Sequence, residues 1–406
     1  MTQVPMIETQ YRWLLLLSAF VVMMVISIYQ YSWFLFSFEI QADYSWSLAS
    51  LGLVYTIFHY TSTLIQPFSG YIADTFSPRW VALCAALLVG AGFILCSIFP
   101  SVWPFSIYYG LGGFGGGILY GISTATAIKW FPDKRGFATG LVVFGFGAGT
   151  ALFNLAIEKS LLLNGLAPTF RYLGIIMLAV LIPLSLVYRY PKDNLTIPSK
   201  GSDNPKKLKE AHDFRPLAML KTYQWYLIYF SFSVTISIVL IFGAQMKVLA
   251  VEFGLPDGYF KSLLICFPLA NGLSRVIAGY VSDIIGRAKT MVIFYSLLGI
   301  SVFTLVFLGN IPILFFLFVI IAALLGGAPF VLYPTTIGDF YGPKYSTTNY
   351  GITYTAKSLA GLISGWLSGY LVMQFGSFKL PLIVIALLSL VSALISLPKF
   401  MKAPGK

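Results

Sequence analysis

Apolar runs of about twenty residues recur along the whole chain, and short polar connections separate them. At 1.5 Å per residue, a helix of about 20 apolar residues crosses the roughly 30 Å hydrocarbon core of a bilayer. We therefore expect each run to form a membrane-spanning helix, twelve in all. The runs fall at about 13–36, 46–72, 80–99, 103–128, 137–158 and 169–188, and then at about 223–247, 258–281, 289–309, 311–334, 348–372 and 379–397.

A polar segment, 190–222, divides the chain into a first half (1–189) and a second half (223–406). The segment is too hydrophilic to enter a bilayer and too short to be a domain. The halves share a loop, because GYIADTFSPR (70–79) follows the second run and GYVSDIIGR (279–287) follows the eighth. This repeat predicts an all-α membrane protein with twelve transmembrane helices in two pseudo-symmetric six-helix bundles. In such carriers the substrate site lies between the halves, near the middle of the membrane.

Composition and charge placement agree with a membrane protein. Hydrophobic residues make up 58% of the chain and charged residues 10%, whereas a soluble domain carries about 25% charge. The net charge of +12 could suggest a nucleic-acid partner. However, most Lys and Arg residues lie on the side of both termini and of the linker, which is the pattern of cytoplasmic segments. We expect a multi-pass protein of the cell (inner) membrane with both termini cytoplasmic, in contact with lipid and with no nucleic acid.

Two cations do not fit this topology, because they lie inside apolar runs. Lys357 stands within GITYTAKSLAGLISGWLSG (351–369), and Arg275 stands within the eighth run. A charge at the centre of a membrane helix costs about 2.5–3.5 kcal/mol on insertion scales. All 14 Asp and Glu residues fall in loops, at termini or at the ends of runs. Because a buried charge requires a partner, we expect an anionic substrate to supply it. Solvation of the cations by carbonyl groups or water is the alternative.

Other patterns indicate packing rather than chemistry. Gly361, Gly365 and Gly369 form a stripe that allows close helix contact. The run YGLGGFGGGILYG (109–121) contains a formal G-x-G-x-x-G match, but the strand and the soluble βαβ unit of a dinucleotide site are absent. No metal-ligand spacing, cysteine framework or nucleophile–base pair is present either. We expect no cofactor, no metal and no enzymatic activity.

Two bundles, the repeated loop and WFPDKRG (130–136) together resemble the major facilitator superfamily. The chain is more specifically similar to the oxalate:formate antiporter family, which is related to the monocarboxylate transporters. The residues that carry this similarity are YQYSW (29–33), YGI (120–122), NGLSR (271–275), YPTT (333–336), NYG (349–351) and Ala356–Lys357. The resemblance implies secondary transport of small carboxylate anions by alternating access, as an oxalate/formate-type exchange.

The resemblance also implies site residues. Arg275 and Lys357 would clamp the two carboxylate ends of a small anion. The other residues of the implied pocket are Gln30, Tyr31, Tyr120, Asn271, Phe330 and Tyr354. Phe330 stands where the oxalate pattern has tyrosine, and Gly326 stands where it has tryptophan. Both departures predict a looser, less polar pocket that admits a larger carboxylate.

Asp74 and Asp283, in the two copies of the repeated loop, are expected to belong to the gate rather than to the substrate site. Each lies at the cytoplasmic end of its helix, where a carboxylate can face the N-terminus of a neighbouring helix. The family pattern has basic residues at the positions of Thr75 and Pro78. That difference weakens the expected latch of the first half.

Two alternatives to anion exchange remain. In a proton-coupled lactate or pyruvate symporter, the proton would ride on the substrate or on His59, the central titratable residue of suitable pKa. The related carriers have a titrating aspartate where this chain has Asn271, which favours exchange. A non-transporting receptor for an anion is the other alternative, but the linker and the C-terminal segment are short. We expect the transporter to work as a monomer.

Overall fold

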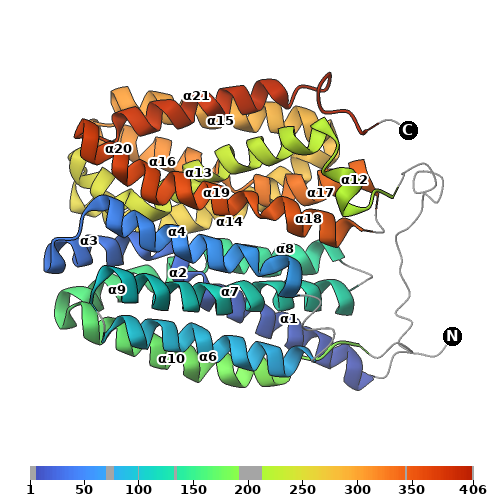
Figure 1. The fold of residues 1–406 in the computed structure, drawn as a ribbon, viewed down its shortest axis with the longest axis horizontal. Coiled ribbons are helices and arrows are strands. Elements are labelled where there is room, and N and C mark those ends of the chain that lie inside the picture. Colours follow the sequence, from blue (N-terminus) through green and yellow to red (C-terminus); the bar gives the residue numbers. More distant parts are fainter. Residues whose placement is uncertain are drawn as a thin grey trace.

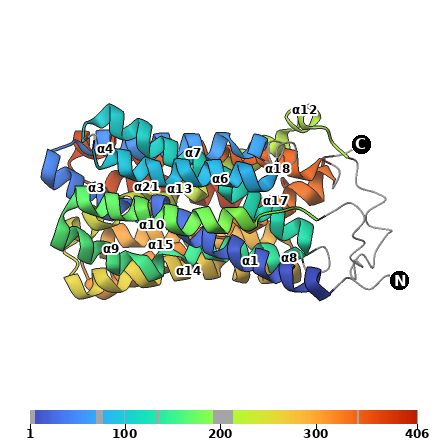
Figure 2. The same ribbon diagram turned by 90° about the horizontal axis from the view of Figure 1, so that it is seen from below.

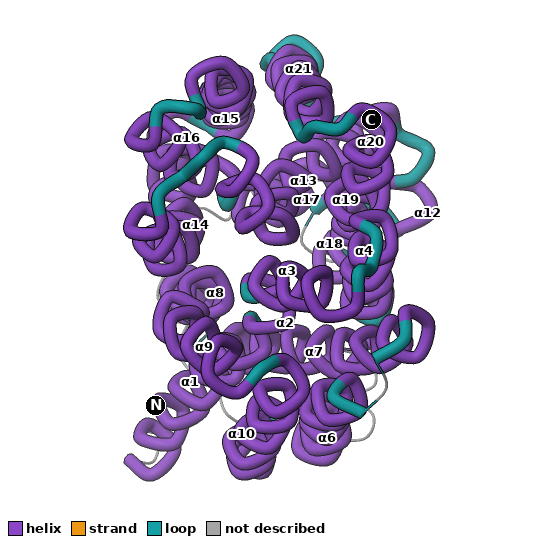
Figure 3. Tube along the Cα trace, turned by 90° about the vertical axis from the view of Figure 1, so that its left-hand side faces the viewer, coloured by secondary structure: helices purple, strands orange, loops and turns teal. Residues whose placement is uncertain are grey.

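The computed structural model describes residues 6–69, 77–98, 100–131, 135–191, 213–342 and 345–404. Within these ranges the regular secondary structure is helical. The helices run side by side along the long axis of the molecule (Figure 1, Figure 2). Seen end-on, helices α1–α10 lie on one side and α13–α21 on the other (Figure 3). The predicted all-helical, two-bundle architecture is confirmed.

Ten segments of the described chain are long and apolar enough to cross a membrane. They are Gln10–Tyr44, Leu48–Ser69, Pro78–Cys96, Val102–Trp130, Phe137–Asn164, Leu166–Val187, Tyr223–Glu252, Asp257–Ile285, Arg287–Leu308 and Pro312–Tyr341. The last two predicted runs are also helical, but one is interrupted and the other, α21 (Lys379–Ile395), has only 17 residues. Several helices extend beyond the predicted ends. The predictions followed the apolar runs, whereas the helices also include polar residues that flank those runs.

The first-half spans contain the helices α1 (Met6–Ile26), α2 (Ile28–Tyr31), α3 (Trp33–Tyr44), α4 (Leu48–Leu64), α6 (Pro78–Cys96), α7 (Val102–Trp130), α8 (Arg135–Ala148), α9 (Thr150–Asn164) and α10 (Leu166–Val187). The second half contains α12 (Pro216–Met219), α13 (Tyr223–Glu252), α14 (Asp257–Ile285), α15 (Arg287–Leu308), α16 (Pro312–Gly326) and α17 (Pro329–Tyr341). Its eleventh span consists of α18 (Ser346–Tyr354), α19 (Ala356–Leu362), the π-helix η1 (Ile363–Leu367) and α20 (Ser368–Phe375).

The first span is broken on both sides of α2, and other helices satisfy the backbone groups that the breaks release. The Tyr109 hydroxyl on α7 donates to the Tyr29 carbonyl at 2.6 Å, and the Tyr55 hydroxyl on α4 donates to the Gln30 carbonyl at 3.3 Å. Irregular backbone at membrane depth is tolerated only where such partners exist. The breaks place α2, with Gln30 and Tyr31, against the second half.

The predicted glycine stripe brings the two halves together. A Cβ atom at Gly361 would lie 2.4 Å from the His59 Cβ atom, and one at Gly365 would lie 2.5 Å from the Gly52 carbonyl oxygen. At Gly369 the Leu48 carbonyl oxygen is equally close, at 2.5 Å. Any side chain at these positions would force α4 away from the α19–α20 segment, so the packing role of the stripe is confirmed.

Polar contacts also join the halves at the end of the molecule opposite α12. The Lys247 Nζ atom on α13 lies 2.9 Å from the Glu39 Oε1 atom on α3. One turn away the Ser37 hydroxyl donates to the Ala244 carbonyl at 3.4 Å. This end of the interface between the halves is therefore closed by direct hydrogen bonds.

The predicted division at 190–222 stays a prediction, because residues 192–212 lie outside the described chain. The same holds for the first copy of the repeated loop: Gly70, Tyr71, Asp74 and Thr75 are not among the described residues.

Candidate functional site

The two predicted cations approach one another at the centre of the interface between the halves. Arg275 on α14 is 3% exposed and Lys357 on α19 is 4% exposed. Both lie against the ring of Phe330 on α17. The Arg275 Cζ atom is 4.6 Å from the ring centroid and the Lys357 Nζ atom is 5.9 Å from it. The two cations can therefore be no farther apart than the sum of these distances, 10.5 Å.

Neither cation forms an ion pair with a carboxylate in the described part of the chain; the ion pairs found there involve other residues. The Arg275 Nη1 atom donates to the Val143 carbonyl on α8, which belongs to the other half. Its Nε and Nη2 atoms are buried without a hydrogen-bond partner. Carbonyl solvation, the alternative considered for the cations, thus accounts for one of the three guanidinium nitrogens.

α8 and α14 approach closely where Arg275 crosses between the halves. A Cβ atom at Gly147 would lie 2.9 Å from the Gly272 Cα atom and 3.2 Å from the Arg275 Cζ atom. Glycine at these two positions allows the guanidinium to reach the Val143 carbonyl. Arg275 is therefore held by the first half even though it belongs to the second.

A cavity reaches Lys357 from the first half. Its empty space, counted together with the open solvent at its mouth, is about 330 Å³. Tyr120 and Gly116 of α7, Phe146 of α8, and Tyr354 and Lys357 of the second half are among the residues that line it. Arg275 is not part of this lining. The structure therefore brings Lys357, Tyr120 and Tyr354 together around one cavity, whereas Arg275 contacts the same Phe330 ring from outside this lining.

Other predicted pocket residues form contacts between the halves. The Tyr31 hydroxyl donates to the Asn271 Oδ1 atom at 3.0 Å. The Asn271 Nδ2 atom lies 3.5 Å from the Ala323 carbonyl. Gln30 is completely buried, and both polar atoms of its side-chain amide lack a partner. These three side chains are buried polar groups that do not line the cavity.

Phe146 is a cavity residue that the sequence reasoning did not identify. Its ring centroid lies 5.4 Å from the Lys357 Nζ atom, 5.2 Å from the Tyr120 ring and 5.8 Å from the Tyr31 ring. The only sequence signal is its place among the glycines of VVFGFGAG (142–149). Small neighbours allow one large ring to project from α8 into the centre. However, the segment contains both Phe144 and Phe146, and its pattern does not distinguish them.

The expectation that Gly326 opens the pocket is wrong. A Cβ atom at this position would lie 2.1 Å from the Val239 Cγ2 atom of α13. The space that a tryptophan would need is thus occupied by a neighbouring helix. Phe330, the other departure, is 6% exposed and contacts both cations through its ring face.

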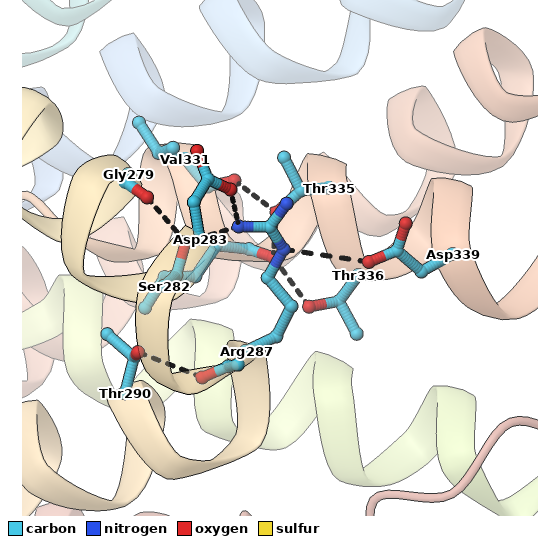
Figure 4. A network of polar contacts seen from close by, with 11 residues as sticks. Gly279, Ser282, Asp283, Arg287, Thr290, Val331, Thr335, Thr336 and Asp339 are labelled. Atoms are coloured by element: carbon cyan, nitrogen blue, oxygen red, sulfur yellow. Dashed lines mark hydrogen bonds and ion pairs between the residues drawn. The ribbon is translucent and has the colours of Figure 1, made fainter. Parts of the chain in front are cut away.

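Asp283 lies away from the cavity in a charge cluster at one end of α14 (Figure 4). The Arg287 Nη1 atom lies 2.6 Å from the Asp283 Oδ1 atom, and the Arg287 Nε atom lies 3.5 Å from the Asp339 Oδ2 atom. The cluster links α14, α15 and α17. Asp283 therefore does not line the cavity, and its gating role stays a prediction; Asp74 lies outside the described residues.

His59 is buried on α4 beside the second half. It is 0% exposed, and both ring nitrogens lack a hydrogen-bond partner. Its ring packs edge-on against Tyr55, with centroids 4.4 Å apart, and it contacts Gly361, one turn beyond Lys357. His59 is thus close to the site without lining the cavity.

Comparison with known proteins assigns the fold to a family. The Major Facilitator Superfamily matches residues 15–263 and 228–405. The chain is 32% identical over 370 residues to the oxalate:formate antiporter of Oxalobacter formigenes, covering 90% of this chain and 86% of that protein. It is 24% identical over 383 residues to a probable sulfoacetate transporter, SauU, of Cupriavidus necator, covering 88% and 86% of the two chains. The inward-open xylose transporter XylE of E. coli has the same fold, with a TM-score of 0.72, 16% identity and 95% of each chain covered.

Proposed function

The chain belongs to the Major Facilitator Superfamily, whose members carry small molecules across membranes and are not enzymes, and on this premise we propose that it exchanges small carboxylate anions. The proposed mechanism is alternating access, with an oxalate/formate-type exchange. One observation supports it above all: two buried cations lie against a single ring and pair with no carboxylate in the described residues.

The spacing of the cations suits a short dianion. They are at most 10.5 Å apart. A charge-assisted hydrogen bond from each cation to a carboxylate oxygen takes up about 2.8 Å. Because the Arg275 distance is measured to Cζ, about 1.3 Å behind its nitrogens, an anion lying between the cations has at most about 4 Å between its two bound oxygens, which a two- to three-carbon dicarboxylate can span. A monocarboxylate brings one negative charge to two cations, so it neutralises only one of them.

Repulsion between the cations favours exchange over net flux. At 10.5 Å and an effective dielectric constant of 20, two positive charges repel by about 1.6 kcal/mol, and by more if they are closer. When an empty carrier reorients, its free energy rises by this repulsion and by the cost of desolvating both cations. A bound anion offsets both, so loaded forms reorient faster than empty ones.

The names of two relatives are consistent with this chemistry. Oxalate carries two carboxylates, and sulfoacetate carries a carboxylate and a sulfonate. Both cargoes thus present two negative groups a short distance apart. We extend this class, rather than either compound, to the present chain.

A proton-coupled monocarboxylate symporter is the second candidate, and His59 is the observation that favours it. Its fully buried imidazole, with two unpartnered nitrogens, lies beside α19, where a proton carrier of a symporter would be needed. Asn271 argues against symport, because an amide cannot titrate. We further propose that the protein lies in the cell (inner) membrane, with both termini cytoplasmic, and works as a monomer.

The test is counterflow by the purified protein in proteoliposomes. Vesicles loaded with unlabelled oxalate, formate, malonate, lactate or pyruvate would be assayed for uptake of labelled anion, with and without a pH gradient. Exchange predicts rapid uptake into anion-loaded vesicles and slow uptake into empty ones. Equal rates in both would refute exchange, and uptake that requires the pH gradient would replace it by symport.

A further inference from the structure

The glycine run of α7 contains one position that helix packing does not explain. At Gly112 an added Cβ atom would lie 2.1 Å from the Tyr29 hydroxyl oxygen. At Gly115 it would lie 2.5 Å from the Ala85 carbonyl oxygen, and at Gly117 it would lie 2.3 Å from the Ser62 carbonyl oxygen. These glycines are required because neighbouring helices occupy the space of a side chain.

Gly116 differs from its neighbours. Apart from the adjoining turns of α7 itself, no described atom lies within 4 Å of the position that its Cβ would take. It nevertheless lines the cavity that contains Lys357, and it lies one helical turn before Tyr120, on the same face of α7. A glycine inside a helix costs roughly 0.5–1 kcal/mol relative to alanine. Since packing does not require glycine here, the open volume of the cavity is what its missing side chain provides.

We propose that Gly116 determines the size of cargo that the carrier accepts, by leaving room in the cavity for an anion longer than oxalate. The inference rests on the proposed carboxylate exchange. The sequence predicts additional space in the pocket at Gly326, but Val239 fills that space. The open space lies at Gly116 instead. Lys357 supplies charge at the same cavity, so residue 116 limits the length of the cargo and not its charge.

The test is a series of substitutions at Gly116 whose side chains fill increasing amounts of the cavity. Gly116→Ala and Gly116→Val add one and three carbon atoms toward the cavity, and neither meets a neighbouring atom at Cβ. Gly140→Ala on α8 is the matched control, because its Cβ also meets nothing within 4 Å but does not line the cavity. Each variant would be assayed in proteoliposomes for counterflow of oxalate, malonate and succinate.

The expected result is a graded loss of the longer anions. The malonate-to-oxalate rate ratio should fall in Gly116→Ala and fall further in Gly116→Val, by about tenfold or more, the usual effect of one methylene in a fitted pocket. The ratio in Gly140→Ala should match the unmodified protein. An unchanged ratio in a folded Gly116→Val protein would overturn the inference.

A second measurement does not depend on the cargo. Gly116→Cys should react with a small charged methanethiosulfonate, scored at that residue by peptide mapping. Leu119→Cys, at a completely buried position outside the lining, should not react. If no carboxylate is exchanged but residue 116 reacts, the proposed function fails and the position of Gly116 in an open cavity stands. If residue 116 does not react, the inference about Gly116 falls whatever the cargo is.

Discussion

Replacing Lys357 with glutamine isolates the second charge of the proposed clamp. Lys357 is 4% exposed and shares the Phe330 ring with Arg275. A dianion that bridges both cations loses one charge–charge contact in the variant. A monoanion that sits on Arg275 keeps its main contact. The ratio of dianion to monoanion affinity therefore reports the role of Lys357 directly.

The expected magnitude follows from Coulomb's law. At 4 Å and an effective dielectric constant of 20, the lost attraction is about 4 kcal/mol. The glutamine amide can still donate a neutral hydrogen bond worth about 1 kcal/mol. The net loss of about 3 kcal/mol corresponds to about a 10²-fold fall in the oxalate-to-formate affinity ratio. Longer-range attraction to the carboxylate on Arg275 is common to both anions and cancels.

The variant should also change the exchange coupling. Removing Lys357 relieves at least about 1.6 kcal/mol of repulsion in the empty carrier, because the cations are at most 10.5 Å apart. Net formate efflux should then rise by about tenfold relative to formate counterflow. This second readout would not move if Lys357 served only to hold helices together.

The assay is concentration-dependent counterflow in proteoliposomes, with Lys379→Gln as the control. Lys379 is exposed at the start of α21, so its replacement removes a charge without touching the site. An unchanged oxalate affinity in Lys357→Gln would refute the clamp. Equal losses for oxalate and formate, in a protein that is folded and at normal abundance, would refute it as well.

Three further substitutions test other parts of the site. Arg275→Lys should lower the counterflow rate at least about tenfold although the charge is kept. An ammonium lacks the planar fork that can reach the Val143 carbonyl and a carboxylate together. Uptake normalised to protein abundance measures the rate, and a wild-type rate would refute the role of the guanidinium geometry. Phe330→Tyr should raise the preference for oxalate over malonate if a hydroxyl is the donor missing beside the two cations; an unaltered ratio in competition assays would remove that explanation. Glu39→Gln should destabilise the closed end of the interface by about 1 kcal/mol, about fivefold in the closed-to-open ratio, because it breaks the 2.9 Å ion pair with Lys247. Spin-label distances across that end would measure the change in the ratio. An identical distance distribution would show that the ion pair does not hold this end closed.

The local sequence pattern was sufficient for most of the fold. Apolar run length predicts a membrane helix, because backbone groups in hydrocarbon must bond within their own segment. The ten long spans all lie at predicted runs. The interruption of the eleventh run was not predictable, since no proline lies within 348–372 to mark a break before Ala356–Leu362 or at the π-helix Ile363–Leu367. Contacts of the glycine stripe with α4 accompany that irregular segment.

For the site, the sequence by itself determined the charges: a lysine and an arginine in apolar runs, without central acids to pair with them. That conclusion needs only the cost of burying a charge. Which groups surround the cations was decided by the tertiary structure alone. Phe146, the Val143 carbonyl and the open face of Gly116 come from helices far away in the chain, and Val239 fills the space expected at Gly326. Hydrophobic periodicity identifies which residues are buried, but the volume beside each residue depends on neighbours that only helix packing brings together.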